Sequence, residues 1–302
     1  MKKTLIALAV LAASGASFAQ VTITGTAAYG YRIDSAPTAN ASGFGIDSSN
    51  VTFAAQEDLG GGNTVKASLV LDKTNRTGTG GGDFGLNIGG AWGAIDMSLA
   101  EGSDYLSGDF VGLDGKVFGG LSATDGVSYK TPAIIPGLTF TVAHAEADQA
   151  LGTGSAGNVY NKQRHNTLTA AYSAGPLSVN LGFRSYDNAD LDADKKSRVR
   201  GKASYDFGVA KVGAGFVNTQ LVQGNTADTN VGVSVPFGSL ALAADYGWTK
   251  NAADQTRSGY GITAAYSLSK RTAVTAKYFN YLGAVGDSSN TTRTDLILSH
   301  SF

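Results

Sequence analysis

The stretch of the chain that decides the fold is QVTITGTAAYGYRI, residues 20–33. From Val21 to Ile33 every second residue is apolar or aromatic, except for Gly25, and the residues between them are small, hydroxylated or charged. A period of two places consecutive side chains on opposite faces of a β-strand. The stretch therefore predicts a strand with one apolar and one polar face, and Arg32 belongs to the polar face.

The same alternation returns along the whole chain, for example over Val51–Ala55 and Val65–Leu71, and predicts about sixteen strands. No apolar run downstream of Gln20 is long enough to cross a bilayer as a helix. Short glycine, proline or Asp/Asn/Ser turns alternate with longer polar loops, which are expected over Ser35–Ser42 and Thr74–Gly82 among others. This asymmetry is typical of outer-membrane barrels.

Aromatic residues lie near the ends of the predicted strands, as Tyr205, Phe207, Tyr246 and Trp248 do. Such positions suit the two headgroup levels of a membrane, whereas a secreted sandwich or solenoid with aromatic core residues is the alternative. Strands that cross lipid must close on themselves so that every backbone group is paired. The predicted fold class is all-β, a transmembrane antiparallel barrel of about sixteen strands.

The first nineteen residues differ from the rest of the chain. Lys2 and Lys3 precede an apolar stretch, and Ser17-Phe18-Ala19 offers small residues at the −3 and −1 positions of a cleavage site. This pattern is typical of a secretory signal peptide. We expect residues 1–19 to be removed on export and residues 20–302 to form the barrel in the bacterial outer membrane.

Composition excludes several classes of protein. The 302 residues contain no cysteine and carry a formal net charge of −1, so disulfides, thiolate metal sites and a nucleic-acid footprint are not expected. The three histidines, His144, His165 and His300, fit strand or rim positions better than a catalytic pair. We expect no enzyme activity, no cofactor and no metal site.

The polar faces of the predicted strands carry more bases than acids. Because a charge on the lipid face costs about 2 to 4 kcal/mol at mid-membrane, these side chains are expected to face the lumen. The candidate basic wall consists of Arg32, Lys66, Arg184, Arg198, Arg200, Lys202, Lys277 and Arg293. Further inward bases are Lys130, Lys211 and Arg257, and the expected inward acids are Asp72, Asp83, Asp96, Asp206, Asp245 and Asp295. A solvated patch near the rim is the alternative for the stretch Arg198–Lys202.

The longest irregular interval runs from Glu101 to Ala123 and mixes apolar residues with acids. It is the candidate constriction loop, with Glu101, Asp104, Asp109 and Asp114 facing water. A mobile external loop is the alternative.

Several motifs, in order along the chain, resemble the general porins of Gram-negative bacteria, most closely the neisserial and burkholderial type. They are EDLGGG (57–62), VSYKTP (127–132), PGLTF (136–140), AGPLSV (174–179), YSLSKRT (266–272) and the terminal SHSF (299–302). The resemblance implies a sixteen-stranded trimeric pore whose third external loop folds inward. The chain departs from the family at Ser98-Leu99-Ala100, where a Gly-Arg-Gln stretch is expected, so one wall arginine is absent.

The sequence therefore predicts an outer-membrane porin for passive diffusion of small hydrophilic solutes and ions, with a weak anion preference. Its expected partners are two further copies of the chain in a homotrimer, lipid and lipopolysaccharide, and no nucleic acid. A non-channel barrel, such as an adhesin or a structural barrel, is the alternative function.

Overall fold

The computed structural model describes residues 20–36, 39–75, 78–101, 123–147, 164–187, 195–282 and 291–302. Within these ranges the chain forms sixteen strands. They are β1 (Gln20–Ala36), β2 (Ala39–Gly60), β3 (Asn63–Asn75), β4 (Gly78–Gly90), β5 (Gly93–Glu101), β6 (Ala123–Lys130), β7 (Leu138–Ala147), β8 (Arg164–Ala174), β9 (Leu177–Asp187), β10 (Lys195–Asp206), β11 (Lys211–Leu221), β12 (Asn225–Phe237), β13 (Leu240–Lys250), β14 (Thr256–Ser267), β15 (Thr272–Leu282) and β16 (Thr291–Ser301).

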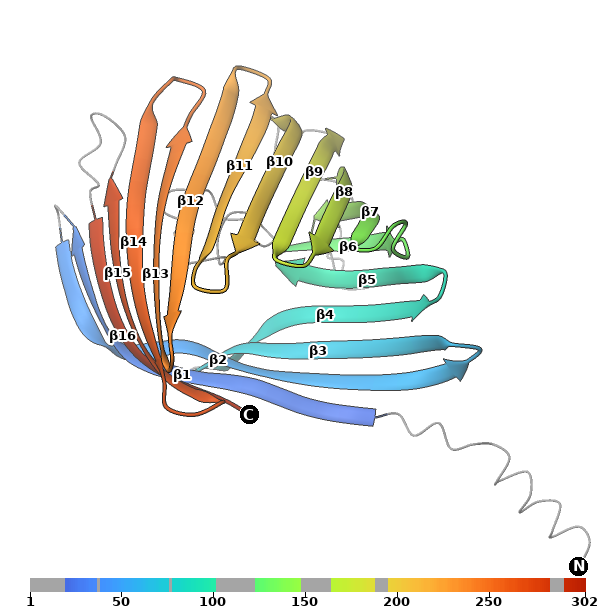
Figure 1. Ribbon diagram of the computed structural model, residues 1–302, viewed down its shortest axis with the longest axis horizontal. Coiled ribbons are helices and arrows are strands. Elements are labelled where there is room, and N and C mark those ends of the chain that lie inside the picture. The colour runs from blue at the N-terminus through green and yellow to red at the C-terminus, as the bar shows by residue number, and fades with distance from the viewer. Residues whose placement is uncertain are drawn as a thin grey trace, which may run out of the picture.

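Each strand pairs antiparallel with its neighbours in the sequence, and β1 pairs with β16, so the sheet is a closed barrel. Figure 1 shows the blue β1 beside the red β16 at this seam. The predicted fold class and the expected closure of the sheet are therefore confirmed. Closure leaves no sheet edge with unpaired backbone groups.

The seam is completed by the last residue of the chain. Phe302 and Gly25 exchange two backbone hydrogen bonds, each 3.0 Å between N and O. The Phe302 ring lies against Gly25, where a Cβ atom would collide with it. A glycine at position 25 is therefore required for the C-terminus to lie flat against β1, which explains the gap in the apolar pattern of this strand.

The connections differ between the two ends of the barrel. At one end the turns are short, as at residues 61–62, where Gly61 and Gly62 have φ of 62° and 78°. At the other end four gaps between strands, residues 102–122, 148–163, 188–194 and 283–290, lie outside the described part of the chain. Short turns mark the periplasmic end of outer-membrane barrels.

Two of the expected loops are wrong. Over Ser35–Ser42 the strands β1 and β2 remain paired as far as Ala36 and Ala39, and Ser35 Oγ donates to Asn40 Oδ1 at 2.9 Å. Over Thr74–Gly82 the pairing of β3 and β4 extends to Asn75 and Gly78. Where a strand extends beyond the lipid, both of its faces contact water. Its sequence then lacks the apolar alternation, and the pattern predicts a loop although the hairpin continues.

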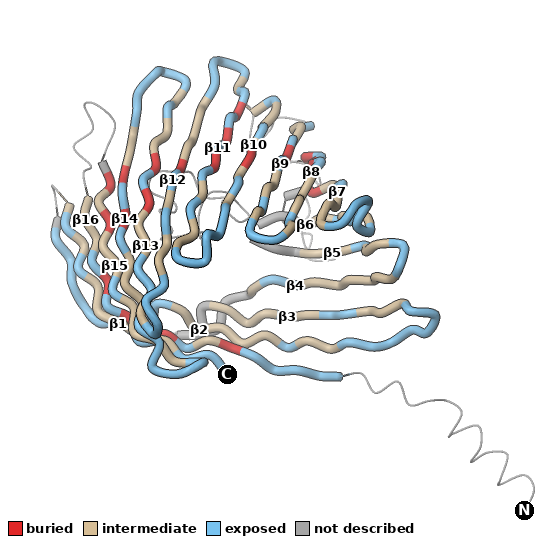
Figure 2. The backbone as a smooth tube through the Cα atoms, viewed as in Figure 1, coloured by how far each residue is buried: buried red, intermediate tan, exposed pale blue. Residues whose placement is uncertain are grey.

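The barrel has no continuous apolar core among the described residues. Figure 2 shows the buried positions as short separate patches on the strands. Large apolar side chains are instead exposed on the outer face. Aromatic pairs lie toward both ends, with Tyr205 and Phe207 at the short-turn end, their ring centroids 4.6 Å apart, and Tyr246 and Trp248, 5.6 Å apart, toward the opposite end.

In the described part of the chain, no helix has the length and apolar character needed to span a membrane.

Candidate functional site

The strand registers sort the side chains into an outer and an inner face, because residues directly opposite each other in antiparallel strands point the same way. One row crosses β7 to β10 and contains Val142, Leu168, Phe183 and Val199. These side chains are 57%, 50%, 49% and 45% exposed, although all four are apolar. This row therefore belongs to the face that meets lipid, and the rows beside it face the lumen.

The neighbouring inner row brings two arginines side by side. Arg184 on β9 lies directly opposite Arg198 on β10, and Thr167 and Thr219 lie on the two outer sides of the pair. Arg184 Nε donates to Thr167 Oγ1 at 3.1 Å, and Arg198 Nε donates to Thr219 Oγ1 at 3.0 Å. The threonines hold both side chains against the wall, while the two positive charges remain adjacent.

Two more bases continue this group on β10. Arg200 lies opposite Gly182, and Lys202 lies opposite Asn180. A Cβ atom at Gly182 would lie 2.9 Å from Arg200 Nε, so the absence of a side chain there gives the arginine room along the wall. We call Arg184, Arg198, Arg200 and Lys202 the basic cluster.

Tyr186 and Lys195 extend the basic cluster toward the long-loop end. Lys195 Nζ and Arg198 Cζ each lie 5.9 Å from the centroid of the Tyr186 ring, which is within cation–π distance. His165 lies opposite Tyr186 and is buried. Tyr186 is absent from the predicted wall residues, although it stands two residues after Arg184 and so shares its face under a period of two.

A second group of charges lies where the barrel closes. Arg32 on β1 contacts Asp295 on β16 through Nε and Oδ1 at 2.7 Å, and it contacts Asp47 on β2 through Nη2 and Oδ1 at 3.4 Å. Arg293 Nε lies 2.9 Å from Asp34 Oδ1. We call Arg32, Asp34, Asp47, Arg293 and Asp295 the paired cluster.

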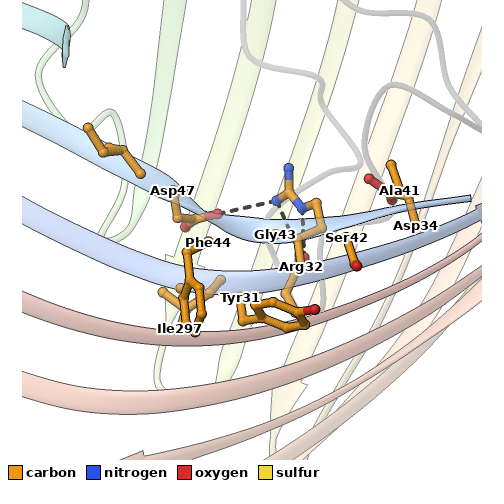
Figure 3. Close-up of a pocket in the computed structure, with 13 residues that line it drawn as sticks. Tyr31, Arg32, Asp34, Ala41, Ser42, Gly43, Phe44, Asp47 and Ile297 are labelled. Carbon is orange, nitrogen blue, oxygen red and sulfur yellow. Dashed lines mark hydrogen bonds and ion pairs between the residues drawn. The ribbon is translucent and has the colours of Figure 1, made fainter. Parts of the chain in front are cut away.

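The paired cluster borders a cavity of about 270 Å³. Figure 3 shows Arg32 reaching toward Asp47 on one side of the sheet, with Tyr31 and Phe44 on the other side. The rings of Tyr31 and Phe44 meet edge to face with centroids 4.8 Å apart. Asp295 is only 3% exposed, and its two carboxylate oxygens accept a bidentate pair of hydrogen bonds from Arg32.

The barrel and its charged lumen are similar to those of known proteins. The sequence profile of the family described as Gram-negative porin matches residues 4–283. The chain belongs to the Gram-negative porin family. The outer membrane porin protein 32 of Delftia acidovorans is 30% identical to this chain in an alignment 317 residues long. The alignment covers 91% of this chain and 88% of the relative.

Solved porins share the fold. The anion-selective porin from Comamonas acidovorans matches with a TM-score of 0.73 and 21% identity, over 94% of this chain and 100% of that one. A variant of the Rh. blastica porin matches with a TM-score of 0.71 and 14% identity, with the same coverage. As a member of this family the chain is an outer-membrane porin that allows passive diffusion of small hydrophilic solutes and ions.

The porin's remaining candidate wall residues lie on other strands. Lys66 on β3 is opposite Gln56 and Asn87, and Lys277 on β15 is opposite Asp295. The register therefore gives all eight candidate basic residues inner-face positions. It does not bring them together in one place, because they divide between the basic cluster, the paired cluster and these two lysines.

Four inward acids among the described residues are absent from the sequence prediction. Asp34 follows Arg32 by two residues, and Asp228 lies opposite Thr249, whose Oγ1 donates to it. Asp58, next to a short turn, lies opposite Thr64. These three could have been found by extending the period of two.

The fourth missed acid, Asp47, lies at an irregularity of β2. Ile46 lies opposite Tyr29 and Ser48 lies opposite Ala28, so Asp47 is the extra residue of a β-bulge. A bulge interrupts the alternation and turns one side chain to the other face.

The candidate constriction loop is largely outside the described residues. Glu101 is the last residue of β5, and its backbone pairs with Ala123, the first residue of β6. Asp104, Asp109 and Asp114 lie in residues 102–122, outside the described part of the chain.

The histidines of the porin occupy separate positions. His144 lies on the outer face, where its Nδ1 is 2.8 Å from Asn166 Oδ1, and His300 Nδ1 is 2.9 Å from Thr272 Oγ1. The described residues contain no group of three or more His, Cys, Asp or Glu side chains that could hold a metal ion.

Proposed function

We propose that this porin passes anions more readily than cations and that the basic cluster produces the preference. The observation that carries the proposal is the adjacent pair Arg184 and Arg198, with Arg200 next to it, on the inner face. The solved Comamonas acidovorans structure is described as an anion-selective porin, which supports the same property here.

The preference is expected to be weak. Four acids join the inward acids that the sequence pattern identifies, and they offset most of the inward bases in number. Lumen water and salt also screen charges beyond about 10 Å at 0.1 M ionic strength. Only charges near the narrowest section of the pore therefore contribute to ion selection.

Reversal potentials in a potassium chloride gradient test the proposal. Replacing Arg198, Arg200 and Lys202 by glutamine should reduce the chloride-to-potassium permeability ratio by about two- to fourfold, because three positive charges leave the lumen wall. The matched control replaces the exposed residues Lys196, Lys250 and Lys270 by glutamine, which removes the same charge away from the inner face. Cation preference in the unaltered protein, or equal shifts in both variants, contradicts the proposal.

We also propose that the segment Glu101–Ala123 folds inward and narrows the lumen. In support, Phe279 and Tyr281 are each 5% exposed on the inner face of β15, and their stacked rings have centroids 5.7 Å apart. An inserted segment packs against buried side chains of this kind. Deleting residues 106–118 should raise the single-channel conductance and the solute size limit while the barrel still folds. Unchanged conductance and size limit would instead indicate an external loop.

The assembly is a further proposal that rests on the family. We propose a homotrimer embedded in lipid and lipopolysaccharide. Planar-bilayer recordings should then show conductance rising in groups of three equal steps. Single independent steps from purified protein would argue for a monomer, and a lack of any steps would favour the alternative of a non-channel barrel.

We propose that residues 1–19, which lie outside the described residues, are the export signal, and that the protein catalyses no reaction. N-terminal sequencing of the outer-membrane form should begin at Gln20. A sequence that starts at Met1 in the outer membrane would contradict the cleavage.

A further inference from the structure

A second cavity, of about 520 Å³, lies on the inner wall near the short-turn end of the barrel. Its lining comes from β6 to β11 and from the turn between β6 and β7. Among the described residues that line it are three lysines, Lys130, Lys202 and Lys211, and no acid. Since short turns are periplasmic in outer-membrane barrels, the cavity lies at the periplasmic mouth of the pore.

The floor of this cavity is a row of serines. Ser178 on β9 lies opposite both Ser173 on β8 and Ser204 on β10. The Oγ atoms of Ser173 and Ser178 are 3.4 Å apart. Serine side chains are small, so the space above the row remains open and forms the cavity. Each serine hydroxyl can donate a hydrogen bond to an anion.

The lysines stand on the two sides of the serine row. Lys130 is the last residue of β6, on one side. Lys202 precedes Ser204 by two residues on β10, and Lys211 is the first residue of β11, so both lie on the other side. Two described acids lie beside the cavity without lining it. Asp206 is opposite Lys211, and its Oδ1 accepts from Gly208 N at 2.7 Å. Asp96 on β5 is opposite Ser128, two residues from Lys130.

The distance between the lysines on the two sides of the cavity determines which anions can contact both sides. β6 and β10 are four strand spacings apart, which is about 19 Å along the wall at the level of the backbone. The curvature of the barrel and the length of the lysine side chains shorten this gap but do not close it. Chloride or a single phosphate group cannot contact both sides, whereas an anion with charged groups several ångströms apart can.

We propose that this cleft binds a small solute with two or more phosphate or carboxylate groups, arranged so that they reach Lys130 on one side and Lys202 and Lys211 on the other. The serine row hydrogen-bonds the middle of the ligand. The cleft concentrates such anions at the periplasmic mouth. The cleft shares Lys202 with the basic cluster, whereas Lys130 and Lys211 belong to the cleft alone, so variants at these two lysines test the cleft independently of the ion preference.

Inorganic tripolyphosphate is the probe, and its binding is measured by titration calorimetry on the purified protein in detergent at low ionic strength. The unaltered protein should bind it saturably and more tightly than inorganic phosphate. The double variant Lys130→Gln with Lys211→Gln should bind at least about tenfold more weakly, since two charge-assisted contacts are lost. The double variant with arginine at both positions should retain binding, which shows that charge rather than a folding defect is responsible.

Two comparison variants locate the site. Lys270→Gln removes an exposed charge from another turn at the same mouth and should leave the affinity within about twofold of the unaltered protein. Arg198→Gln with Arg200→Gln alters the basic cluster and should also leave it within about twofold. No saturable binding, an unaffected Lys130 and Lys211 variant, or loss confined to the Arg198 and Arg200 variant overturns the proposal. Calorimetry does not depend on ion selectivity, so this result and the reversal potentials are independent.

Discussion

In the basic cluster an arginine lies directly opposite another arginine across a strand pair, whereas in the paired cluster an arginine lies directly opposite an aspartate. Arg184 faces another arginine across the strand pair, and each is held by a threonine hydroxyl. Arg32 faces Asp295 and also contacts Asp47. A like-charge pair lowers stability but projects a field into the lumen, whereas an ion pair stabilises the wall and cancels most of its own field. The comparison shows that counting inward charges says less about a pore than knowing their neighbours.

The largest effect is expected from a change that tests the faces themselves. Val199→Lys places a charge on the outer face between Arg198 and Arg200 and should lower the free energy of unfolding by about 2 to 4 kcal/mol. Thr169→Lys, on the inner face opposite Thr141 and Gly182, is the matched control and should cost less than about 1 kcal/mol. Urea unfolding in lipid vesicles measures both. If the costs are reversed, the basic cluster does not face the lumen.

The next effect concerns the paired cluster. Asp295→Asn leaves Arg32 without its closest acid and should lower the free energy of unfolding by about 1 to 3 kcal/mol, because Asp295 is buried while Arg32 is partly exposed. The control is Asp254→Asn, which breaks an exposed ion pair with Lys250 and should cost less than about 0.5 kcal/mol. If both variants lose the same free energy of unfolding, the contact between Arg32 and Asp295 is no stronger than an ordinary surface ion pair.

In the basic cluster we expect a smaller change in the free energy of unfolding, and this change is an increase. Arg184→Gln removes one member of the like-charge pair and keeps an amide that can donate to Thr167, so stability should rise by about 0.5 kcal/mol. The anion preference should fall at the same time. Arg32→Gln is the comparison and should lower stability. A loss of more than about 1 kcal/mol in Arg184→Gln would show that the adjacent arginines are a structural element.

The smallest effect is expected from salt. Raising potassium chloride from about 0.1 M to 1 M shortens the screening length from about 10 Å to 3 Å and should bring the permeability ratio closer to one. The stability difference between Asp295→Asn and the unaltered protein should change little, because that contact is buried. A permeability ratio that does not change with salt would indicate that selection depends on pore size rather than on charge.

Much of the candidate site follows from local pattern. Arg198, Arg200 and Lys202 alternate with Val199, Gly201 and Ala203, and the register gives them one inner face. The same rule extends to Asp34 and Tyr186, which could have been selected from the sequence. At Asp47 the rule gives two answers, because a bulge shifts the alternation by one residue. The apolar residues Phe44 and Ile46 place Asp47 on the polar face, whereas the alternation over Val51–Ala55 places it on the apolar face.

The sequence by itself determined that the chain forms strands with two unlike faces, that they number about sixteen, and that bases lie on the polar face. This follows because the side-chain period of a strand is local and a charge in lipid is costly. Only the tertiary structure decided which charges neutralise each other. Arg32 and Asp295 are 263 positions apart and meet because the last strand closes on the first. The field inside the pore depends on such contacts, and closure of the barrel is a property of the whole sheet rather than of any one strand.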